Sequence, residues 1–238
     1  MHLLITGTSS GLGHALAGEY LKRGSTVWGL SRRAPSDLQA HSSYSHFTCD
    51  LSELDQLAAV VKQLPEGIPV LDRAILNAAV LPDINDMKDT PLEEIHRVMD
   101  INVWANKLLI DLITDRFKEV RQVVAVSSGA SVSGSRGWNS YSISKAALNM
   151  VISLYAHEMP ETHFSAIAPG VVDTAMQESI ASLPDDPRFP TQKRLKEMRE
   201  AHEMQTSEDA AALFIQVMGY ALDEPSGSYL DVRDYRGA

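Results

Sequence analysis

The sequence has one cysteine in 238 residues, and aromatic side chains make up only 6% of it. One cysteine cannot form a disulfide within the chain, and such scarcity is typical of a reducing compartment. Cys49 lies in the run HFTCDL, where we expect it to pack in a strand rather than act as a nucleophile. One cysteine cannot build a thiolate metal site, and the 8 histidines show no HExxH or i, i+4 pairing. The sequence therefore predicts no metal centre.

Long apolar runs are also missing, since none approaches the roughly 18 residues that a membrane span requires. Positive charge is in deficit: 31 acidic residues against 21 basic ones give a formal net charge of −10. Such a surface repels nucleic acid and anionic lipid. The initiator Met leads at once into the strand-like run LLIT, which leaves no room for a signal peptide. We therefore expect a cytoplasmic protein with a small-molecule partner, and neither nucleic acid nor membrane.

Short apolar runs alternate with longer amphipathic patterns along the chain. The runs expected to form strands are 3–6, 26–31, 46–50, 73–78, 122–128, 163–169 and 227–232. Near-continuous apolar strands separated by helices indicate a parallel sheet that is covered on both faces. The pattern predicts an α/β fold, doubly wound and Rossmann-like, with a mostly parallel seven-stranded sheet and helices on both faces.

The alternation continues without an internal repeat, a low-complexity tract or a linker rich in Gly and Ser, so we expect one domain over residues 1–238. Ser52 and Asp55 have the spacing of a capping box at the start of the third helix.

Residues 183–205 differ from the rest, because three prolines precede a highly charged stretch. This segment is expected to form either a solvated surface helix or a mobile substrate lid over a pocket.

The stretch TGTSSGLG, residues 6–13, follows the first predicted strand and opens the first predicted helix. Gly7 can turn tightly there, Gly11 lets a pyrophosphate approach the backbone, and Gly13 lets helix and strand pack closely. The free N–H groups of the helix N-terminus would then face the phosphates. A turn without a ligand is the alternative, but position and spacing favour dinucleotide binding. The expected contacts are Gly7, Ser9, Ser10, Gly11, Leu12 and Gly13.

The TGxxxGxG spacing resembles that of the short-chain dehydrogenase/reductase family, and further motifs extend the resemblance over nearly the whole chain. Asp50-Leu51 resembles the family's adenine-pocket pair. Asn77-Ala78-Ala79 resembles its Asn-Ala-Gly motif, with Ala79 in place of the glycine. The stretch PGVVDT, residues 169–174, resembles the PGxVxT motif beside the nicotinamide. The resemblance implies cofactor contacts at Asp50, Leu51, Asn77, Ala78, Ala79, Pro169, Gly170, Val172 and Thr174.

The stretch YSISK places Tyr141 four residues before Lys145, so both can share one helix face. A free tyrosine titrates near pH ~10, and a neighbouring ammonium stabilises its phenolate, so we expect Lys145 to lower the pKa of Tyr141. Ser128 precedes Tyr141 by the family's spacing, and Asn102 falls where the family has its helix asparagine. The resemblance implies that Ser128 binds the substrate carbonyl and that Tyr141 is the acid or base. It also implies that Asn102 holds a water of the proton relay, and that Tyr141 and Lys145 contact the cofactor.

The end of the second predicted strand bears on the choice of cofactor. Sites that prefer NAD place an acidic residue there, against the ribose 2′-hydroxyl. This sequence has GLSRR, with Ser31 at the acidic position and Arg32 and Arg33 after it. A carboxylate repels the 2′-phosphate of NADP, whereas a guanidinium can bind it through two hydrogen bonds. Two solvated arginines in a loop are the alternative; the sequence favours NADP(H), with contacts at Ser31, Arg32 and Arg33.

Together these features predict an NADP-dependent oxidoreductase, a carbonyl reductase that reduces a ketone, diketone or quinone-like compound or oxidises the matching alcohol. A non-catalytic dinucleotide-binding sensor or scaffold on the same fold is the alternative, although a sensor has no need of Ser128, Tyr141 and Lys145. A sugar-nucleotide epimerase or dehydratase would share YxxxK, but it needs a larger carboxy-terminal substrate domain. Trp138 and Met176 are expected as walls of the substrate pocket, or as plain packing.

Two predicted helices, at 91–118 and 141–158, resemble those through which the family forms four-helix interfaces. The first carries Leu108, Leu109, Leu112 and Ile113, which is more apolar surface than packing on one sheet face requires. We therefore expect a homo-oligomer, either a homodimer or a homotetramer.

Overall fold

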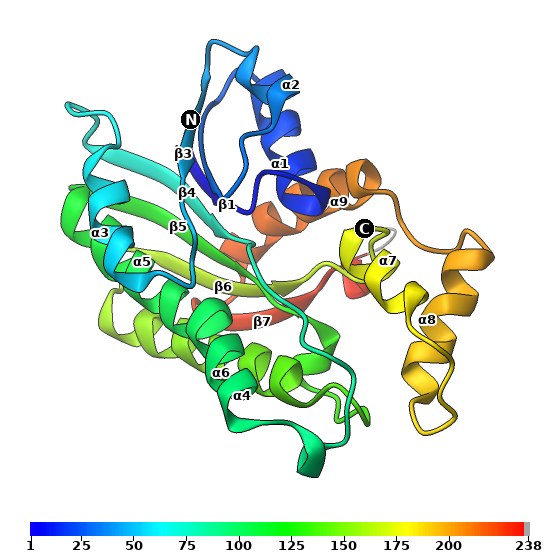
Figure 1. The fold of residues 1–238 in the computed structure, drawn as a ribbon. Coiled ribbons are helices and arrows are strands. Elements are labelled where there is room, and N and C mark those ends of the chain that lie inside the picture. The colour runs from blue at the N-terminus through cyan, green and yellow to red at the C-terminus, as the bar shows by residue number, and fades with distance from the viewer. Residues whose placement is uncertain (236–238) are drawn as a thin grey trace.

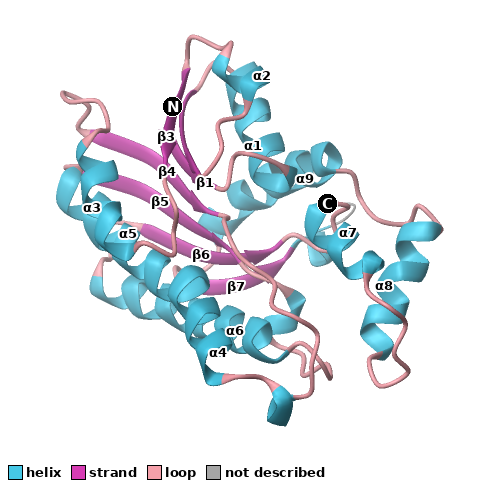
Figure 2. Cartoon of the chain, viewed as in Figure 1, coloured by secondary structure: helices cyan, strands magenta, loops and turns pink. Residues whose placement is uncertain are grey.

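The computed structural model describes residues 1–235, and its strands form a parallel sheet in the order β3-β2-β1-β4-β5-β6-β7 (Figures 1 and 2). Every neighbouring pair in this order is parallel, so the predicted fold class is confirmed. The strands are β1 (His2–Thr6), β2 (Thr26–Ser31), β3 (Tyr44–Thr48), β4 (Val70–Leu76), β5 (Glu119–Val126), β6 (His163–Ala168) and β7 (Ser228–Asp231).

Helices cover both faces of this sheet. On one face α1 (Gly11–Lys22) packs beside α9 (Ser207–Tyr220) (Figure 1). The other face carries α3 (Leu54–Lys62), α5 (Ala105–Arg116) and α6 (Asn139–Glu158). The remaining helices are the short α2 (Ser36–Gln39), α4 (Leu92–Met99), which runs into α5 through a π-helical turn at Asp100–Trp104, α7 (Ala175–Ser182) and α8 (Pro190–Glu200).

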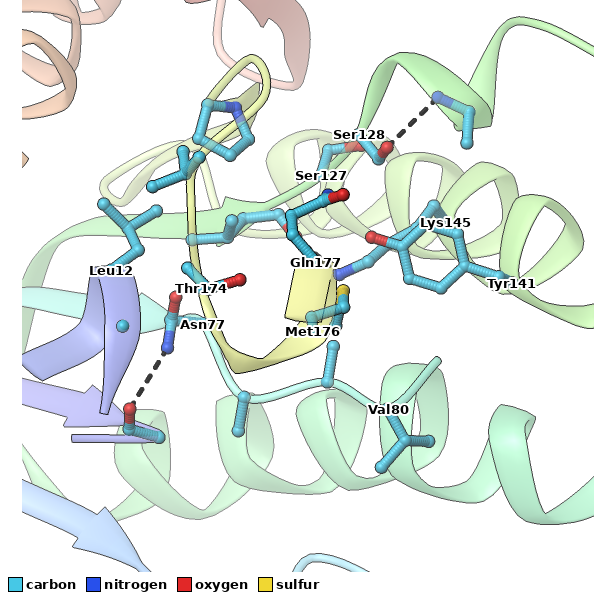
Figure 3. A pocket seen from close by; sticks show the side chains of 18 of the residues that line it. Leu12, Asn77, Val80, Ser127, Ser128, Tyr141, Lys145, Thr174, Met176 and Gln177 are labelled. Atoms are coloured by element: carbon cyan, nitrogen blue, oxygen red, sulfur yellow. Dashed lines mark hydrogen bonds between the residues drawn. The ribbon is translucent and has the colours of Figure 1, made fainter. Parts of the chain in front are cut away.

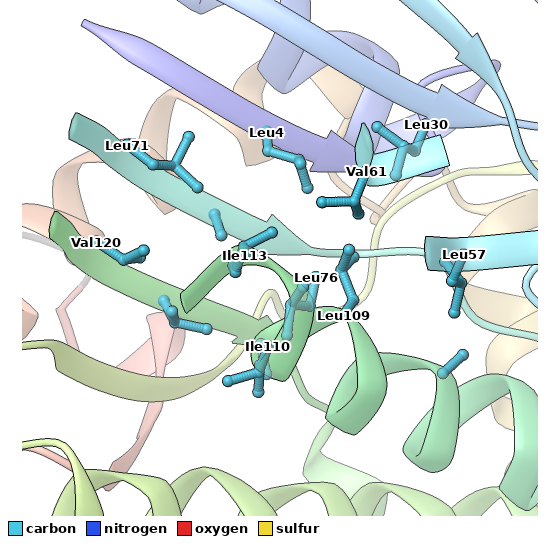
Figure 4. Close-up of a cluster of buried hydrophobic side chains, with 14 of the residues drawn as sticks. Leu4, Leu30, Leu57, Val61, Leu71, Leu76, Leu109, Ile110, Ile113 and Val120 are labelled. Atoms are coloured by element: carbon cyan, nitrogen blue, oxygen red, sulfur yellow. The ribbon is translucent and has the colours of Figure 1, made fainter. Parts of the chain in front are cut away.

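The core is split between the two faces by the pleat of the strands. In β1, Leu3 and Ile5 belong to the cluster under α1 and α9, whereas Leu4 between them belongs to the cluster under α3, α5 and α6. All three side chains have no solvent exposure. Successive side chains of a strand point to opposite faces, so a strand covered on both sides must be apolar throughout. Figure 4 shows the second cluster, where Leu4 and Leu76 of the sheet lie near Leu109 of α5.

The chain order creates a crevice at the carboxyl edge of the sheet. From β1 the chain moves outward to β2 and β3, and it then returns to place β4 on the other side of β1. The segments that leave β1 and β4 therefore diverge to opposite faces. Ligands of doubly wound sheets bind at such a reversal, outside the carboxyl ends of the strands. The motifs singled out in the sequence follow β1, β2, β4, β5 and β6 and meet at this edge.

Element boundaries differ from the sequence prediction in several places. β3 begins at Tyr44, two residues before the predicted 46–50, because Tyr44 pairs with Val27 and is buried. β4 begins at Val70 rather than at residue 73. The capping box at Ser52 was wrong: α3 begins at Leu54 without a side-chain cap, and the Ser52 hydroxyl donates to Asp50 Oδ1 at 2.8 Å.

The apolar residues of α5 do not form the excess surface that the sequence indicated. Leu109 and Ile113 have no solvent exposure, and Leu108 and Leu112 pack partly buried against the same cluster. These four residues therefore contribute to the core that α5 shares with the sheet, two of them only in part, and an oligomer stays a prediction. Large exposed apolar side chains lie instead at Trp104, Ile143, Met150 and Leu154.

The charged segment 183–205 contains α8, which is not a purely solvated helix. Its Gln192 and Leu195 are buried, so one side of α8 packs against the protein while the rest faces solvent. Motion of the segment as a lid stays a prediction. The single domain over 1–238 also stays a prediction. Within residues 1–235, no helix combines the length and the apolar character that crossing a membrane would need.

Candidate active site

A cavity of about 730 Å³ opens at the carboxyl edge of the sheet. This volume lies in the range typical of sites for small molecules and cofactors. Its walls come from the segments after β1, β2, β3, β4, β5, β6 and β7, together with α6, α7 and α8. Figure 3 shows Leu12 and Asn77 at one side of this pocket and Ser128, Tyr141 and Lys145 at the other.

The glycine-rich segment forms one wall of the cavity. Gly7 and Gly11 line it with φ of +76° and +59°, a conformation that side chains other than glycine rarely adopt. Gly13 does not line the cavity; a Cβ there would lie 2.4 Å from the carbonyl oxygen of Gly7, so its role is close packing. Ser9, Ser10 and Leu12 complete this wall.

The N-terminus of α1 is built for an anion. Ser10 occupies the N-cap position but makes no side-chain hydrogen bond to the first turn, which carries no acidic residue. The first N–H groups of a helix have no partner within it, and its dipole favours negative charge at this end. These residues therefore fit a pyrophosphate at the cavity wall.

Asn77 ties the end of β4 to the end of β1. Its Nδ2 donates to the carbonyl oxygen of Thr6 at 2.9 Å. The backbone N–H groups of Asn77 and Ala78 in turn donate to Thr6 Oγ1 at 2.9 and 3.0 Å. These bonds fix the two diverging segments against each other, and Asn77, Ala78 and Ala79 line the cavity beside the glycine-rich wall.

The turn after β2 presents two arginines to the cavity. Arg32 and Arg33 line it and are exposed, and neither forms an ion pair within residues 1–235. The Ser31 hydroxyl is buried and donates to the carbonyl oxygen of Arg33 at 2.9 Å, which holds the turn. Asp50 and Leu51 line the neighbouring wall; the Ser52 N–H, and less strongly Arg32, hold the pKa of Asp50 below its usual value.

Tyr141 is buried in the cavity wall with its hydroxyl beside Ser128. Burial raises the pKa of Tyr141, and a hydrogen bond with the Ser128 side chain opposes this only in part. The Ser128 Oγ also accepts the Ala130 N–H at 3.1 Å, which fixes its orientation (Figure 3). Contrary to the expectation from Lys145, the pKa of Tyr141 is raised, because desolvation of the phenolate outweighs the hydrogen bond with Ser128.

Lys145 lies one helical turn from Tyr141 and is 2% exposed. Its Nζ donates to the carbonyl oxygen of Val126 at 2.7 Å and lies 5.8 Å from the centroid of the Tyr141 ring. Burial lowers the pKa of the Lys145 ammonium to about 8. The Lys145 amine can therefore both gain and lose a proton at a pH near neutral.

This shifted pKa predicts a pH-dependent stability. The unfolded chain keeps the Lys145 proton up to pH 10.5 and the folded chain only up to about 8. The unfolded state therefore binds more protons between these values, and the free energy of unfolding rises with pH there. One pKa unit corresponds to about 1.4 kcal/mol. Between pH 8 and 10.5, the free energy of unfolding of the wild type should therefore rise by about 3 kcal/mol relative to that of Lys145→Met. Urea unfolding of both proteins at pH 7 to 10.5 measures the gain; a constant difference would mean an ordinary pKa for Lys145.

Asn102 does not line the cavity. It sits in the π-helical turn before α5 with no solvent exposure. Its Oδ1 accepts the Val80 N–H at 2.8 Å, and its Nδ2 donates to the Val80 carbonyl at 3.0 Å and to Ser144 Oγ at 3.0 Å. The side chain thus clamps the segment after β4 to α6, and a role in holding water stays a prediction.

Most of the predicted site residues meet at this one cavity. Those on its walls are Gly7, Ser9, Ser10, Gly11, Leu12, Ser31, Arg32, Arg33, Asp50, Leu51, Asn77, Ala78, Ala79, Ser128, Trp138, Tyr141, Lys145, Pro169, Gly170, Val172, Thr174 and Met176. Gly13 and Asn102 lie outside it. Trp138 packs edge-on against the Tyr141 ring, with centroids 6.1 Å apart, which makes it a wall beside the hydroxyl.

Among the wall residues that were not named individually from the sequence are two groups, one in α8, within the segment 183–205 expected as a possible lid, and one at the end of β7. Thr191, Arg194 and Leu195 of α8 line the cavity, and Leu195 packs with Trp138, Tyr141 and Ile180. Asp231, the last residue of β7, and Arg233 form an ion pair at 2.6 Å and also line the cavity. A signal for the pair existed, because a seventh parallel strand must end at the same edge as the others. No cluster of three or more His, Cys, Asp or Glu side chains suited to a metal occurs among residues 1–235.

Comparison with known proteins gives consistent matches. The family model described as short chain dehydrogenase matches residues 1–184. A benzil reductase of Saccharomyces cerevisiae is 30% identical, over 98% of this chain and 96% of its own length. A benzil reductase of Bacillus subtilis is 27% identical, over 98% of both chains. The crystal structure of the short-chain dehydrogenase/reductase YIR035C from Saccharomyces cerevisiae superposes with a TM-score of 0.85, at 25% identity, over 97% of this chain and 95% of that one.

Proposed function

The chain belongs to the short-chain dehydrogenase/reductase family, and we propose that it is an NADPH-dependent reductase of small carbonyl compounds, with aromatic 1,2-diketones such as benzil as substrates. The observation that carries this proposal is the arrangement of the cavity. Tyr141, Ser128 and Lys145 are gathered at one side of it (Figure 3). Arg32 and Arg33, which form no ion pair within residues 1–235, line the same cavity. The family's members are oxidoreductases that use NAD or NADP, and this chain is one of them.

The cofactor would be held by residues whose geometry suits each of its parts. The N-terminus of α1 and the backbone of Gly7 and Gly11 suit the pyrophosphate. Asp50 and Leu51 suit the adenine, and Pro169 and Gly170 suit the nicotinamide. The reduced nicotinamide, when bound, supplies the hydride for the carbonyl carbon.

The preference for NADP(H) is proposed from the turn after β2. Ser31 stands where an acidic residue would select NAD, and its hydroxyl is engaged by the backbone of Arg33 at 2.9 Å. Arg32 and Arg33 bring two guanidinium groups that form no ion pair within residues 1–235, although Arg32 lies close enough to Asp50 to lower its pKa. A guanidinium binds phosphate through two parallel hydrogen bonds, which suits the 2′-phosphate of NADP.

Tyr141 is proposed as the proton donor for carbonyl reduction. Burial raises the pKa of Tyr141, so the phenol is protonated at neutral pH and holds the proton that carbonyl reduction consumes. Ser128 already hydrogen-bonds the Tyr141 hydroxyl and can bind the same carbonyl oxygen. Lys145, with a pKa of about 8, can return a proton to the tyrosine after each turnover.

The substrate class is proposed from the walls around the Tyr141 hydroxyl. Trp138, Met176 and Leu195 give this end of the cavity an apolar and partly aromatic lining, which suits the phenyl groups of a diketone. The two relatives named benzil reductase match this chain over nearly their full length. The location of the enzyme in the cytoplasm stays a prediction that rests on its single cysteine.

Cofactor consumption tests the proposal directly. Oxidation of NADPH at 340 nm should be followed with benzil, simple ketones, quinones and a buffer blank, and NADH should be run in parallel. We expect turnover of benzil with NADPH and slower turnover with NADH. If NADPH binds tightly but no compound is reduced, the alternative of a non-catalytic dinucleotide sensor would replace the enzyme.

A homodimer or homotetramer is proposed from an apolar face on α6. Ile143, Met150 and Leu154 are each at least 41% exposed, and their spacing of seven and four residues puts them on one side of the helix. Exposed apolar patches of this kind are typical of protein interfaces. Light scattering at micromolar concentration should give at least twice the mass of one chain. Leu154→Glu should shift the protein toward monomer and Met87→Glu, also at an exposed Met, should not; a monomeric wild type would contradict the proposal.

A further inference from the structure

Three loops meet beside the substrate end of the cavity and are joined by one carboxylate. Asp86, in the loop before α4, accepts from Arg136 Nε at 2.6 Å and from Arg136 Nη2 at 2.8 Å. Arg188, in the loop between α7 and α8, makes its shortest bond to Asp186 of its own loop at 2.6 Å, and its Nη1 lies 3.3 Å from the Asp86 carboxylate. The Asp86 side chain is only 14% exposed although both arginines reach the surface. The ionic contact therefore links residues 82–90, 133–138 and 183–190.

An apolar contact lies beside this ionic one. The Arg188 guanidinium stacks 4.9 Å from the centroid of the Phe189 ring, and Phe189 is 3% exposed. Gly137 follows Arg136 with φ of +91°. A Cβ at Gly137 would lie 2.7 Å from Phe189 Cδ1 and 2.6 Å from Ile84 Cγ2. Phe189 and Ile84 thus fill the space that a side chain at Gly137 would occupy. Each of the three loops contributes one residue to this apolar contact.

The residues that contact Asp86 lie next to two walls of the cavity near Tyr141, one formed by α8 and one by Trp138. Phe189 is the residue immediately before α8, whose Thr191, Arg194 and Leu195 line the cavity. Leu195 lies about 9 Å along the chain from Phe189 in a rigid helix, so the start of α8 fixes where Leu195 lies. On the other side, Arg136 and Gly137 immediately precede Trp138, which packs against Tyr141 and Leu195. The Asp86 carboxylate is thereby connected to both walls, beside the apolar contact of Gly137, Phe189 and Ile84.

The Asp86 carboxylate is ionised at neutral pH. The hydrogen bond from Arg136, followed by the charges of Arg136 and Arg188, holds the pKa of Asp86 below its usual value. A carboxylate that receives a bidentate guanidinium is held in a defined geometry, unlike most exposed ion pairs. Neither arginine lines the cavity, so the pair is free of direct contact with a ligand there.

We propose that Asp86 is a positioning residue for substrate specificity: by joining Arg136 to Arg188 it holds α8 against Trp138 and so closes the substrate end of the cavity. This inference rests on the proposed function of the same site. It assigns to Asp86 an effect on the affinity for the carbonyl compound, with no effect on cofactor binding or on proton transfer by Tyr141.

Asp86→Asn removes the charge and keeps the shape of the side chain. With benzil as the probe and NADPH saturating, KM should rise by about two- to thirtyfold. kcat and the Kd for NADPH should stay within about twofold of the wild type. Asp86→Glu restores the charge and should recover part of the lost affinity. Arg188→Gln should raise KM as well, and the double variant should show less than the product of the two effects, because both act through one contact.

Asp72→Asn is the matched control. Asp72 also has a 14% exposed side chain and an arginine partner, Arg121, at 2.6 Å, but it lies on β4 away from the cavity. Its KM for benzil should equal that of the wild type. An unchanged KM for Asp86→Asn would overturn the proposal, and so would a joint loss of kcat, NADPH affinity and melting temperature, which indicates general damage.

Limited trypsin digestion keeps the two proposals separate. The segment 188–199 carries Arg188, Lys193, Arg194, Lys196 and Arg199. Asp86→Asn should be cut faster there than the wild type or Asp72→Asn, whether or not benzil is a substrate. If the wild type reduces no carbonyl compound, the proposed function fails, and equal cleavage of all three proteins would still overturn the role of Asp86.

Discussion

Replacing Tyr141 with phenylalanine is expected to lower the turnover of benzil by about 10²–10⁴-fold, the usual contribution of a positioned acid-base group. The substitution keeps the buried ring and its edge contact with Trp138 and removes only the hydroxyl. Binding of NADPH and the melting temperature should therefore change little. Lys145→Met should also lose turnover, since it removes the amine one turn away.

Tyr155→Phe is a control on the same helix. Tyr155 is buried to a similar degree, and its hydroxyl donates to Asp111 on α5, far from the cavity walls. Loss of that hydroxyl should affect stability and leave the turnover number unchanged. Steady-state kinetics of the wild type, Tyr141→Phe and Tyr155→Phe, with fluorescence titration of NADPH, test whether the Tyr141 hydroxyl takes part in the reaction. Normal turnover by Tyr141→Phe would show that Tyr141 is only a packing residue.

The second large effect concerns the cofactor. Changing both Arg32 and Arg33 to alanine should weaken NADPH binding by about ten- to a hundredfold or more, because charge-assisted hydrogen bonds contribute about 1.5–3 kcal/mol each. Binding of NADH should barely change, since the N-terminus of α1 and Gly7 and Gly11 stay intact. The two arginines are exposed and carry no ion pair within residues 1–235, so folding should be unaffected.

Isothermal titration of NADPH and NADH measures this loss of the preference for NADPH. Arg23→Ala is the control. Arg23 is an exposed arginine at the far end of α1, where it pairs with Glu19 at 3.7 Å. Its loss should leave both affinities unchanged. Equal losses for NADPH and NADH in the double variant would mean that Arg32 and Arg33 act elsewhere on the cofactor.

The periodic and local features of this chain could be predicted from its sequence. Apolar runs predicted the parallel sheet because strands covered on both faces must be apolar throughout, as Leu3, Leu4 and Ile5 are. The glycine spacing predicted the turn after β1, where Gly7 and Gly11 need positive φ. Motifs that follow parallel strands converge on one edge, so Asp50, Asn77 and Ser128 could be placed in one cavity without knowledge of side-chain contacts.

Features that depend on tertiary contacts could not be read in the same way. Ser52 has the spacing of a helix cap, but its hydroxyl finds the Asp50 carboxylate two residues away. The pKa of Tyr141 is raised by the burial of its side chain, which depends on the elements packed around it and not on its neighbours in sequence. Nothing in the local sequence shows that Asp86, Arg136 and Arg188 meet, because 102 residues separate the first from the last.

Transfer of deuterium tests the central claim most directly. Wild-type enzyme should be mixed with benzil and NADPH deuterated at C4 of the nicotinamide, using each of the two C4 stereoisomers in turn, and the product should be analysed by mass spectrometry. We predict that one stereoisomer yields benzoin with a single deuterium on the carbinol carbon, and that Tyr141→Phe binds the same cofactor but forms little product. NADPH bound by the wild type without formation of any deuterated alcohol would contradict a hydride-transferring carbonyl reductase.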